Sequence, residues 1–241
     1  MPQQFRPPAV PLVTHDPFFS VWSFSDRLTD DWTKHWTGKN QAMCGMARID
    51  GKAYRWMSRG LPDLPAMKQD SLAVLPHETS YSFSAGGVKL TARFLPWQDI
   101  RDPDLCSRDQ TDVELSVVST DGKSHQVALY LDCSGELVVD AASQSVQWSR
   151  LRKGGQEVGA LWRDGRRPLD RTGDDHRCDW GVLYLLPGEG NIGFGGSEAL
   201  RKRFAEHGSL PDDDDFRTPR AVYDDWPVMA CACLLYTSRC V

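Results

Sequence analysis

Adjacent aspartate pairs are the residues of this 241-residue chain whose type and spacing come closest to a catalytic arrangement. Two of the pairs are followed directly by a tryptophan. Glycoside hydrolysis needs two carboxyl groups, one as an acid and one as a base or nucleophile, and an aromatic ring beside them can hold the sugar. However, neighbours in a loop seldom converge on one substrate, and aspartate is common in turns, so no catalytic residue is predicted. The pairs are Asp30-Asp31, Asp174-Asp175 and Asp224-Asp225.

Histidines and cysteines were considered as metal ligands. No two histidines have helix or hairpin spacing with a third ligand nearby, so we expect no metal site and no metal cofactor. The seven cysteines are an odd and irregularly spaced set, which does not indicate a disulfide framework. The residues considered as ligands were His15, His35 and Cys44 in one group and Cys231, Cys233 and Cys240 in another.

The segment "GEGNIG", residues 188–193, matches the glycine spacing of a dinucleotide-binding loop. In that fold the ribose binds an acidic residue at the end of the next strand. Here the segment "HGSLPDDDD" leaves no room for a strand between the following helix and the aspartates 212–215. We therefore interpret "GEGNIG" as a glycine-rich turn into a short strand, "NIGF", and the aspartates as a solvated loop. No nucleotide cofactor is predicted.

Short strands separated by turns are predicted from residue 45 onward, and this pattern is typical of an antiparallel β-sandwich. Three hairpins are predicted, each between segments of alternating hydrophobic residues. In the third, residues 113–117 are expected to pair with residues 127–131. Their turns are Asp50-Gly51, Gly86-Gly87 and Asp121-Gly122, since glycine accepts positive φ. Further strands are predicted at residues 145–151, 158–163 and 180–186.

One short helix is predicted in "SEALRKRFAEHG". Ser197 can cap its start, Leu200 and Phe204 lie on one face, and Gly208 can end it. The first forty residues are rich in proline and tryptophan and show no clean period. We interpret them as an irregular Trp-rich segment packed across the sandwich. The predicted fold class is therefore mainly β, an antiparallel β-sandwich with an irregular N-terminal segment and one short helix.

Composition argues against two classes of partner. The chain is 40% hydrophobic and 25% charged, with a net charge of −5, and no basic cluster alternates with aromatic residues. We therefore expect no nucleic-acid partner. No apolar run approaches the roughly 18 residues of a membrane-spanning helix, so no membrane span is expected. The opening "MPQQFRPPAVPLV" also lacks the apolar centre of a secretory signal.

The final segment, "CLLYTSRCV", is interpreted as translated sequencing adapter. The DNA string TGT CTC TTA TAC ACA TCT encodes Cys-Leu-Leu-Tyr-Thr-Ser and resembles the mosaic end used in library preparation. Its reverse complement begins AGA TGT GTA TAA, which encodes Arg-Cys-Val and a stop. We therefore expect residues 233–241 to be adapter-derived rather than a genuine C-terminal strand, which removes two of the three ligands from the second cysteine group.

Several longer stretches follow one another in order up to about residue 232. They are "RPPAVPLVTHDPFFSVWSFSDRLTDDWTKHWTGKNQAMCGMARIDGKAYRWM", "FSAGGVKLTARFL", "STDGKSHQVALYLDCSGELVVD", "VQWSR", "RTGDDHRCDWGVLYL" and "GSLPDDDDFRTPRAVYDDWPVMA". Together they resemble the amino-terminal part of the glutaminase A family. The resemblance implies a supersandwich-like β-domain followed, in the parent protein, by a six-helical-hairpin, glycosidase-like catalytic domain. It also implies a secreted or periplasmic location.

The resemblance sets the domain and function hypotheses. Residues 1–75 are expected to form an N-terminal segment packed on the sandwich, residues 76–232 the β-sandwich, and residues 233–241 the adapter tail. The chain would be the non-catalytic part of a hydrolase that converts L-glutamine to L-glutamate and ammonia. Its partner would be the missing C-terminal helical domain. The alternative is a carbohydrate-binding or accessory module whose partner is a glycan or a small polar ligand.

Five residues are predicted to form a rim that contacts the substrate or the partner domain. They belong to aromatic and acidic loop clusters outside the predicted strands, and such loops suit contact with another domain or a polar ligand. The alternative is that the tryptophans anchor the irregular segment. The rim residues are Trp32, His35, Trp36, Asp225 and Trp226.

Overall fold

The computed structural model describes residues 7–97, 99, 101–169, 173 and 175–236. In these residues the fold is mainly antiparallel β, as predicted, and α2 (Ser197–His207) is the only helix longer than one turn. Two single-turn elements accompany it, α1 (Pro103–Cys106) and the 3-10 helix η1 (Gly135–Val138). Neither α-helix combines the length and apolar character that crossing a bilayer requires.

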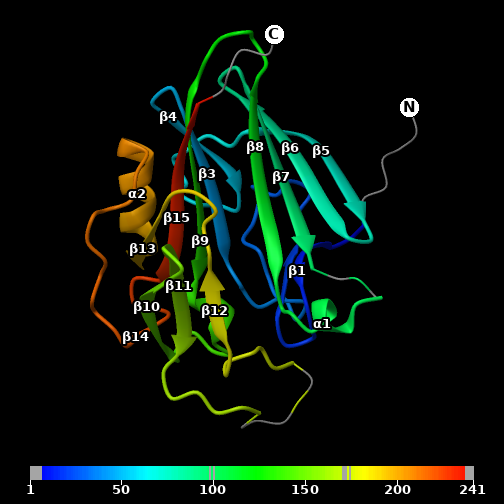
Figure 1. The fold of residues 1–241 in the computed structure, drawn as a ribbon, viewed down its shortest axis with the longest axis vertical. Coiled ribbons are helices and arrows are strands. Elements are labelled where there is room, and N and C mark those ends of the chain that lie inside the picture. The colour runs from blue at the N-terminus through cyan, green and yellow to red at the C-terminus, as the bar shows by residue number, and fades with distance from the viewer. Residues whose placement is uncertain (1–6, 98, 100, 170–172, 174, 237–241) are drawn as a thin grey trace.

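Two large sheets form the sandwich (Figure 1). The central sheet contains, in spatial order, β13 (Asn191–Gly196), β15 (Pro227–Tyr236), β9 (Gln126–Ser134), β3 (Met43–Ile49) and β4 (Lys52–Met57). The opposing sheet contains β5 (Lys68–Leu75), β6 (Glu78–Ala85), β7 (Val88–Pro96) and β8 (Thr111–Ser119). Alternate residues of both sheets point inward, and these meet in the main hydrophobic core.

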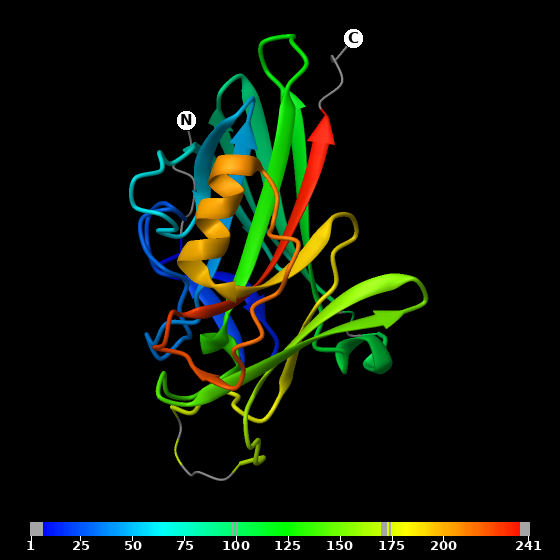
Figure 2. The ribbon, with the colours of Figure 1, turned by 90° about the vertical axis from the view of Figure 1, so that its left-hand side faces the viewer.

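The central sheet is covered on both faces, which explains why β3 and β9 are buried along almost their whole length. Its second face carries α2, whose Leu200 and Phe204 pack on Met46 and Tyr130 (Figure 2). A third sheet packs against the end of the central sheet that includes Met229. It contains β12 (Val182–Leu185), β11 (Gln156–Arg163), β10 (Ser145–Lys153) and β14 (Arg220–Ala221).

Two of the three predicted hairpins are confirmed. β3 pairs with β4 around Asp50-Gly51, and β6 pairs with β7 around Gly86-Gly87. Asp50 and the three glycines of the two turns all have positive φ, between 47° and 87°, the conformation for which glycine is the default residue.

The third hairpin prediction is wrong. β8 pairs with β7 in the opposing sheet, whereas β9 pairs with β3 and β15 in the central sheet. The Asp121-Gly122 segment therefore carries the chain from one sheet to the other. β8 and β9 face the same core from opposite sheets, so both show alternating hydrophobic residues. The same alternation is expected of two strands hydrogen-bonded in one sheet, so the sequence pattern could not distinguish the two arrangements.

The remaining predicted elements are largely confirmed. β10, β11 and β12 occupy the three further segments, and "NIGF" lies in β13, antiparallel to β15. α2 ends at Gly208 in the left-handed conformation, as expected. The Ser197 cap is wrong, because Gly196 is the N-cap and no side chain caps the helix. The Trp-rich segment is less irregular than expected, since β1 (Val10–Thr14) and β2 (Ser20–Ser23) form a two-stranded sheet.

The predicted domain boundaries stay a prediction. β3 and β4, which fall in residues 1–75, are strands of the central sheet, and side chains of β1 join the main core. At the other end, residues 233–236 continue β15 and pair with β9 down to Tyr236↔Gln126. The adapter origin of residues 233–241 also stays a prediction, and residues 237–241 lie outside the described residues.

Candidate functional site

The structure places the five predicted rim residues in two groups. Trp32 and Trp226 meet edge to face, with ring centroids 4.6 Å apart and an interplanar angle of 78°. Asp225 precedes Trp226 in the same turn. His35 and Trp36 lie instead against Pro17, to whose carbonyl oxygen both rings are bonded. The sequence analysis predicted a single rim, whose contact role stays a prediction, and it did not anticipate this separation.

The first group is built around Arg201 of α2, which the sequence analysis did not single out. Its guanidinium carbon lies 5.1 Å from the ring centroid of Trp32 and 5.2 Å from that of Trp226, within the range of cation–π attraction. Nε and Nη2 of Arg201 donate to the two carboxylate oxygens of Asp132, at 2.7 and 3.0 Å. The Tyr130 hydroxyl donates to the same carboxylate at 2.8 Å.

This cluster is deeply buried, since Arg201 is 2% and Asp132 0% exposed. Burial is the largest single effect on the pKa of Arg201 and lowers it, but the neighbouring groups, led by the charge of Asp132, together outweigh burial, so the net shift is upward. Burial raises the pKa of the nearby Cys44 to about 12, so this thiol stays protonated and unreactive. The arrangement is a compensated ion pair rather than a set of groups ready for proton transfer.

A strained turn holds Trp226 in place. Asp225 and Trp226 have φ values of 58° and 40°, an uncommon conformation for residues other than glycine. Their carbonyl oxygens accept from the Ser197 amide at 3.3 and 3.1 Å, and so replace the missing side-chain cap of α2. A Cβ at Gly196 would clash with the carboxylate of Asp225, so a larger residue there would have to displace that side chain.

The Asp225 side chain belongs to an exposed ion network. Its Oδ2 lies 3.3 Å from Nη2 of Arg217 and 3.8 Å from Nη1 of Arg220. The same two guanidinium groups contact Asp215 at 2.6 and 2.9 Å, and the hydrogen bond from Arg217 is the main reason that the pKa of Asp215 falls to about 2.

The aspartates 212–215 were predicted to form a solvated loop, and for two of them this is wrong. Asp215 binds the arginines just described, and Asp214 accepts from Arg150 of β10 at 2.9 Å. Arg217 is a local partner of Asp215, but Arg150 lies 64 residues before Asp214, and no local pattern could indicate that contact.

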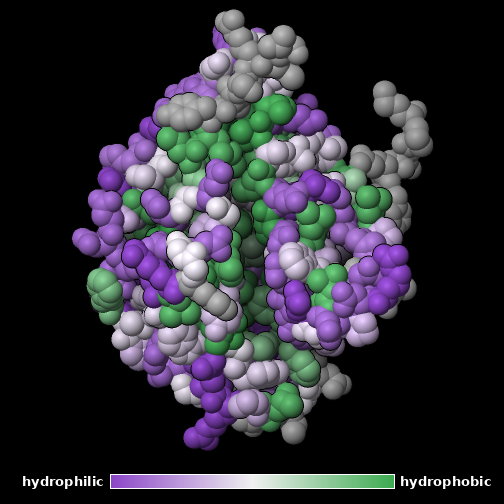
Figure 3. Space-filling model, viewed as in Figure 1, coloured by the Kyte–Doolittle hydropathy of each residue, from purple (hydrophilic) through white to green (hydrophobic). Residues whose placement is uncertain are grey.

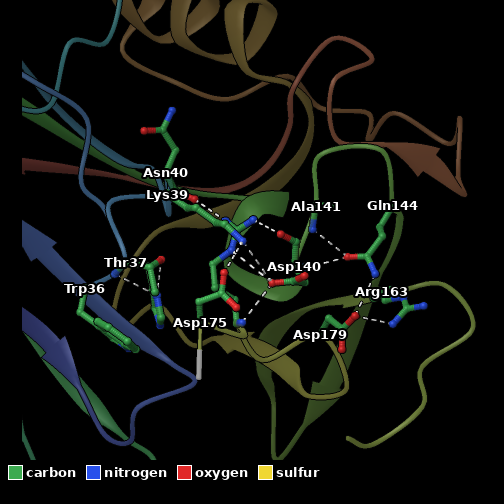
Figure 4. Close-up of polar contacts among 12 residues, drawn as sticks. Trp36, Thr37, Lys39, Asn40, Asp140, Ala141, Gln144, Arg163, Asp175 and Asp179 are labelled. Atoms are coloured by element: carbon green, nitrogen blue, oxygen red, sulfur yellow. Dashed lines mark hydrogen bonds and ion pairs between the residues drawn. The ribbon is translucent and has the colours of Figure 1, made fainter. Parts of the chain in front are cut away.

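His35 is a structural histidine. It is fully buried, with Nε2 3.0 Å from the Pro17 carbonyl oxygen and Nδ1 2.9 Å from the Thr37 hydroxyl. Because a carbonyl only accepts, Nε2 carries the proton and Nδ1 accepts from Thr37. Burial lowers the pKa of His35. Trp36, labelled in Figure 4, is 45% exposed. Its indole Nε1 donates to the Pro17 carbonyl at 2.7 Å, which fixes the ring at the surface.

A buried polar network lies beside this second group (Figure 4). Oε1 of Gln144 accepts from the amide of Asp140 at 2.7 Å, and its Nε2 donates to Asp179 at 2.8 Å. Arg163 pairs with Asp179, and the Arg177 amide donates to Asp140 at 3.2 Å. Arg177 and Asp179 of this network lie in the stretch "RTGDDHRCDWGVLYL", which carried part of the family resemblance. That resemblance was the one feature of the sequence that could have pointed to them.

The outer edge of the network involves one predicted aspartate pair. Lys39 lies 3.9 Å from Asp140 and 3.8 Å from Asp175, whereas Asp174 lies outside the described residues. The first pair has a local role: Asp31 accepts from the Trp32 amide at 2.8 Å and from Lys34 at 2.7 Å. These contacts support the turn interpretation of the aspartate pairs.

Sequence reasoning missed Glu136 in η1, whose pKa is influenced by Trp226 of the first group and by Arg177 of the buried network. Its Oε2 accepts from the Ala42 amide and the Ser134 hydroxyl, both at 3.3 Å. Burial raises its pKa, although the Arg177 charge and the Trp226 side chain act in the opposite direction. A carboxyl group with a raised pKa is the type of group that general acid catalysis uses.

In the described residues no metal site lies at these groups, and a small pocket lies elsewhere. No cluster of three His, Cys, Asp or Glu side chains has the arrangement of a metal site. A shallow pocket of about 200 Å³ lies at the C-terminal end of α2, away from all five predicted residues. It is lined by Arg48, Gln126, Ala128, His207, Gly208, Ser209 and Leu234.

The fold and the site define an antiparallel β-sandwich protein whose connecting segments are anchored by buried arginine–aspartate pairs. Comparison with known families is more specific. Residues 77–238 match the family described as Domain of unknown function (DUF5127), and residues 1–67 match Domain of unknown function (DUF4964). The chain belongs to the DUF5127 family.

Two curated relatives carry glutaminase names. Glutaminase A of Aspergillus oryzae (strain ATCC 42149 / RIB 40) is 27% identical over 241 residues, which cover 93% of this chain and 34% of the relative. The protein named "Probable glutaminase" of Arthroderma benhamiae (strain ATCC MYA-4681 / CBS 112371) is 27% identical over 251 residues, covering 94% and 28%. The predicted resemblance to the glutaminase A family is confirmed, and the chain spans about a third of these relatives.

Proposed function

We propose that this chain is the non-catalytic N-terminal β-sandwich part of a glutaminase A-like hydrolase. The observation that carries the proposal is the unequal coverage: 93% of this chain aligns with only 34% of glutaminase A. The remaining length of the relative would hold the six-helical-hairpin catalytic domain. The parent reaction would be hydrolysis of L-glutamine to L-glutamate and ammonia.

The charge pairs of the site support a scaffolding role. Asp132 is held by Arg201, Asp179 by Arg163, and the Asp140 side chain by the Arg177 amide. Such contacts occupy the carboxylate oxygens and fix them in place, whereas a catalytic acid or base must be within hydrogen-bond reach of the substrate. These carboxylates therefore suit the anchoring of loops.

An apolar hollow supports docking of a partner domain. Figure 3 shows hydrophobic side chains gathered in the hollow between β15 and β8. Several apolar side chains of the strands near it are only partly buried where they pack against the main core: Val113, Leu115 and Val117 of β8, Cys231 of β15 and Leu183 of β12. Incompletely covered apolar surface of this kind marks interaction sites, and we assign it to the helical domain of the parent protein.

The five rim residues have different parts in this proposal. Trp36 and Asp225 are exposed, so they are the members that can contact the catalytic domain. Trp32, His35 and Trp226 hold them in position, because their rings pack on Arg201 or on Pro17. The rim is thus an anchored edge rather than a preformed catalytic centre.

The 241-residue chain is expected to release no ammonia from L-glutamine above a heat-inactivated control, because the length that matches the rest of glutaminase A is not in it. Full-length Aspergillus oryzae glutaminase A is the positive control, and ammonia is measured by a coupled assay. Ammonia release by the chain that disappears in Glu136→Gln would contradict the proposal and place the chemistry at Glu136.

A carbohydrate-binding role is the second candidate, favoured by the exposed and fixed ring of Trp36. In that case Trp36→Ala should abolish retardation of the chain in affinity electrophoresis on the recognised glycan. Trp32→Ala is the matched control, because the Trp32 ring is already occupied by Arg201 and Trp226. Equal retardation of the wild-type chain and Trp36→Ala would exclude a Trp36 platform.

A further inference from the structure

A histidine held between two carboxylates lies where turns of the two large sheets meet. Nδ1 of His125 is 2.6 Å from Oδ2 of Asp50, and Nε2 is 2.9 Å from Oδ1 of Asp121. His125 is 7% exposed. Asp50 belongs to the β3–β4 turn of the central sheet, whereas Asp121 and His125 belong to the connection from β8 to β9.

Both carboxylates are fixed by further bonds. Oδ1 of Asp50 accepts from the Gln126 amide at 2.9 Å. Oδ1 of Asp121 also accepts from the Lys123 amide at 3.0 Å and the Ser119 hydroxyl at 3.1 Å. The imidazole ring of His125 therefore lies between two carboxylates whose orientation is fixed by other hydrogen bonds.

The β6–β7 turn of the opposing sheet packs directly on this cluster. A Cβ at Gly87 would lie 2.7 Å from Oδ2 of Asp121 and 2.9 Å from Cε1 of His125. The Gly87 carbonyl also accepts from the Thr120 amide at 2.8 Å. The histidine thus links a turn of each sheet through the crossover that connects them.

The chemistry of the contacts identifies the protonation state. An ionised carboxylate only accepts hydrogen bonds, so both ring nitrogens must donate, and His125 must be an imidazolium. The charged groups acting on the ring from these turns are Asp50 and Asp121, and the hydrogen bond with Asp50 followed by that with Asp121 raises the pKa of His125. The bond from His125 is in turn the main reason that the pKa of Asp121 falls to about 2.

We propose that His125 is a pH-sensitive clamp that joins the two large sheets at this end while it is protonated and releases them as the pH rises. Loss of one ring proton would set a nitrogen lone pair against a carboxylate, so one of the two contacts must break. Because the folded-state pKa lies above the ordinary value of about 6.5, the stabilisation is complete below that pH. It is lost as the pH rises through the folded-state pKa.

The experiment measures the ring pKa by NMR titration of the full 241-residue chain and its unfolding by urea between about pH 5 and pH 9. The His125 pKa should lie above the ordinary histidine value of about 6.5. Each unit of difference should change the folded-to-unfolded ratio about tenfold between the acid and alkaline limits. His125→Gln should abolish this pH dependence, whereas His77→Gln should preserve it.

A second variant and a local readout keep the test decisive if His125→Gln folds poorly. Asp121→Asn should lower the His125 pKa, because one carboxylate becomes a neutral amide. The hydrogen-exchange protection factor of the Thr120 amide should fall at high pH more than that of Leu131 in the middle of β9. A His125 pKa at or below the ordinary value, or equal protection changes at the two amides, would overturn the clamp.

Discussion

Arg201→Met is expected to lower the free energy of unfolding by about 3–5 kcal/mol, because it leaves the buried Asp132 carboxylate without its counter-charge. Asp132 is fully buried. Among the side-chain donors that the structure describes at its carboxylate, only the Tyr130 hydroxyl would remain after the substitution. The same change removes the cation between Trp32 and Trp226. Urea unfolding followed by tryptophan fluorescence measures both the loss and the changed ring environment.

The matched control is Lys202→Met on the next position of α2. Lys202 is exposed and pairs with Glu198 at the surface, so no measurable loss of stability is expected. The double variant Arg201→Met/Asp132→Leu should recover most of the stability, since it removes both charges together. A loss in Arg201→Met no larger than that in Lys202→Met would show that the pair does not hold α2 on the sheet.

Trp56→Ala is expected to cost about 3–5 kcal/mol of unfolding free energy, because it opens a large cavity in the main core. Trp56 of β4 is fully buried, and its ring lies 6.2 Å from that of Phe83 in the opposing sheet. It therefore fills space between the two sheets. Thermal and urea unfolding of the variant give the loss directly.

Gly45 supplies the control for this prediction. A Cβ at Gly45 would lie 2.3 Å from Cε2 of Trp56, so Gly45→Ala should cost about 1–3 kcal/mol in the wild-type chain through overpacking. In the Trp56→Ala background the ring is gone, and the same substitution should cost much less. Strictly additive losses in this double-mutant cycle would mean that the ring does not lie over Gly45.

Arg201 and Trp56 stabilise the contacts between segments that a scaffolding role requires. Arg201 ties the helix, the Trp-rich segment and the turn before β15 to the central sheet. Trp56 ties the central sheet to the opposing one. Both are far stronger anchors than the surface ion pairs, which are solvated and screened.

Local chemistry explains why part of the fold could be predicted. The Asp50-Gly51 and Gly86-Gly87 turns need positive φ, and few residues other than glycine adopt it readily. α2 shows its apolar face through Leu200 and Phe204 and its end through Gly208. Each of these signals acts within a few residues, so the sequence alone shows it.

The failed predictions depend on partners that lie far along the chain. The Asp121-Gly122 turn has good hairpin chemistry, yet Thr120 bonds to Gly87 of another turn and the strands diverge into different sheets. Asp214 looks solvated in the sequence, yet it accepts from Arg150 of β10, which lies 64 residues earlier in the chain. Local sequence patterns do not indicate these tertiary contacts.

The mainly antiparallel β class, two hairpins, the helix α2 and the resemblance to the glutaminase A family follow from the sequence alone. Three features appear only in the three-dimensional arrangement: Trp32 and Trp226 enclose Arg201, Arg201 pairs with Asp132 69 residues away, and His125 lies between Asp50 and Asp121. Turns and periodicity reflect local backbone preferences. Buried charge pairs instead become strong only after distant segments have packed together and excluded water.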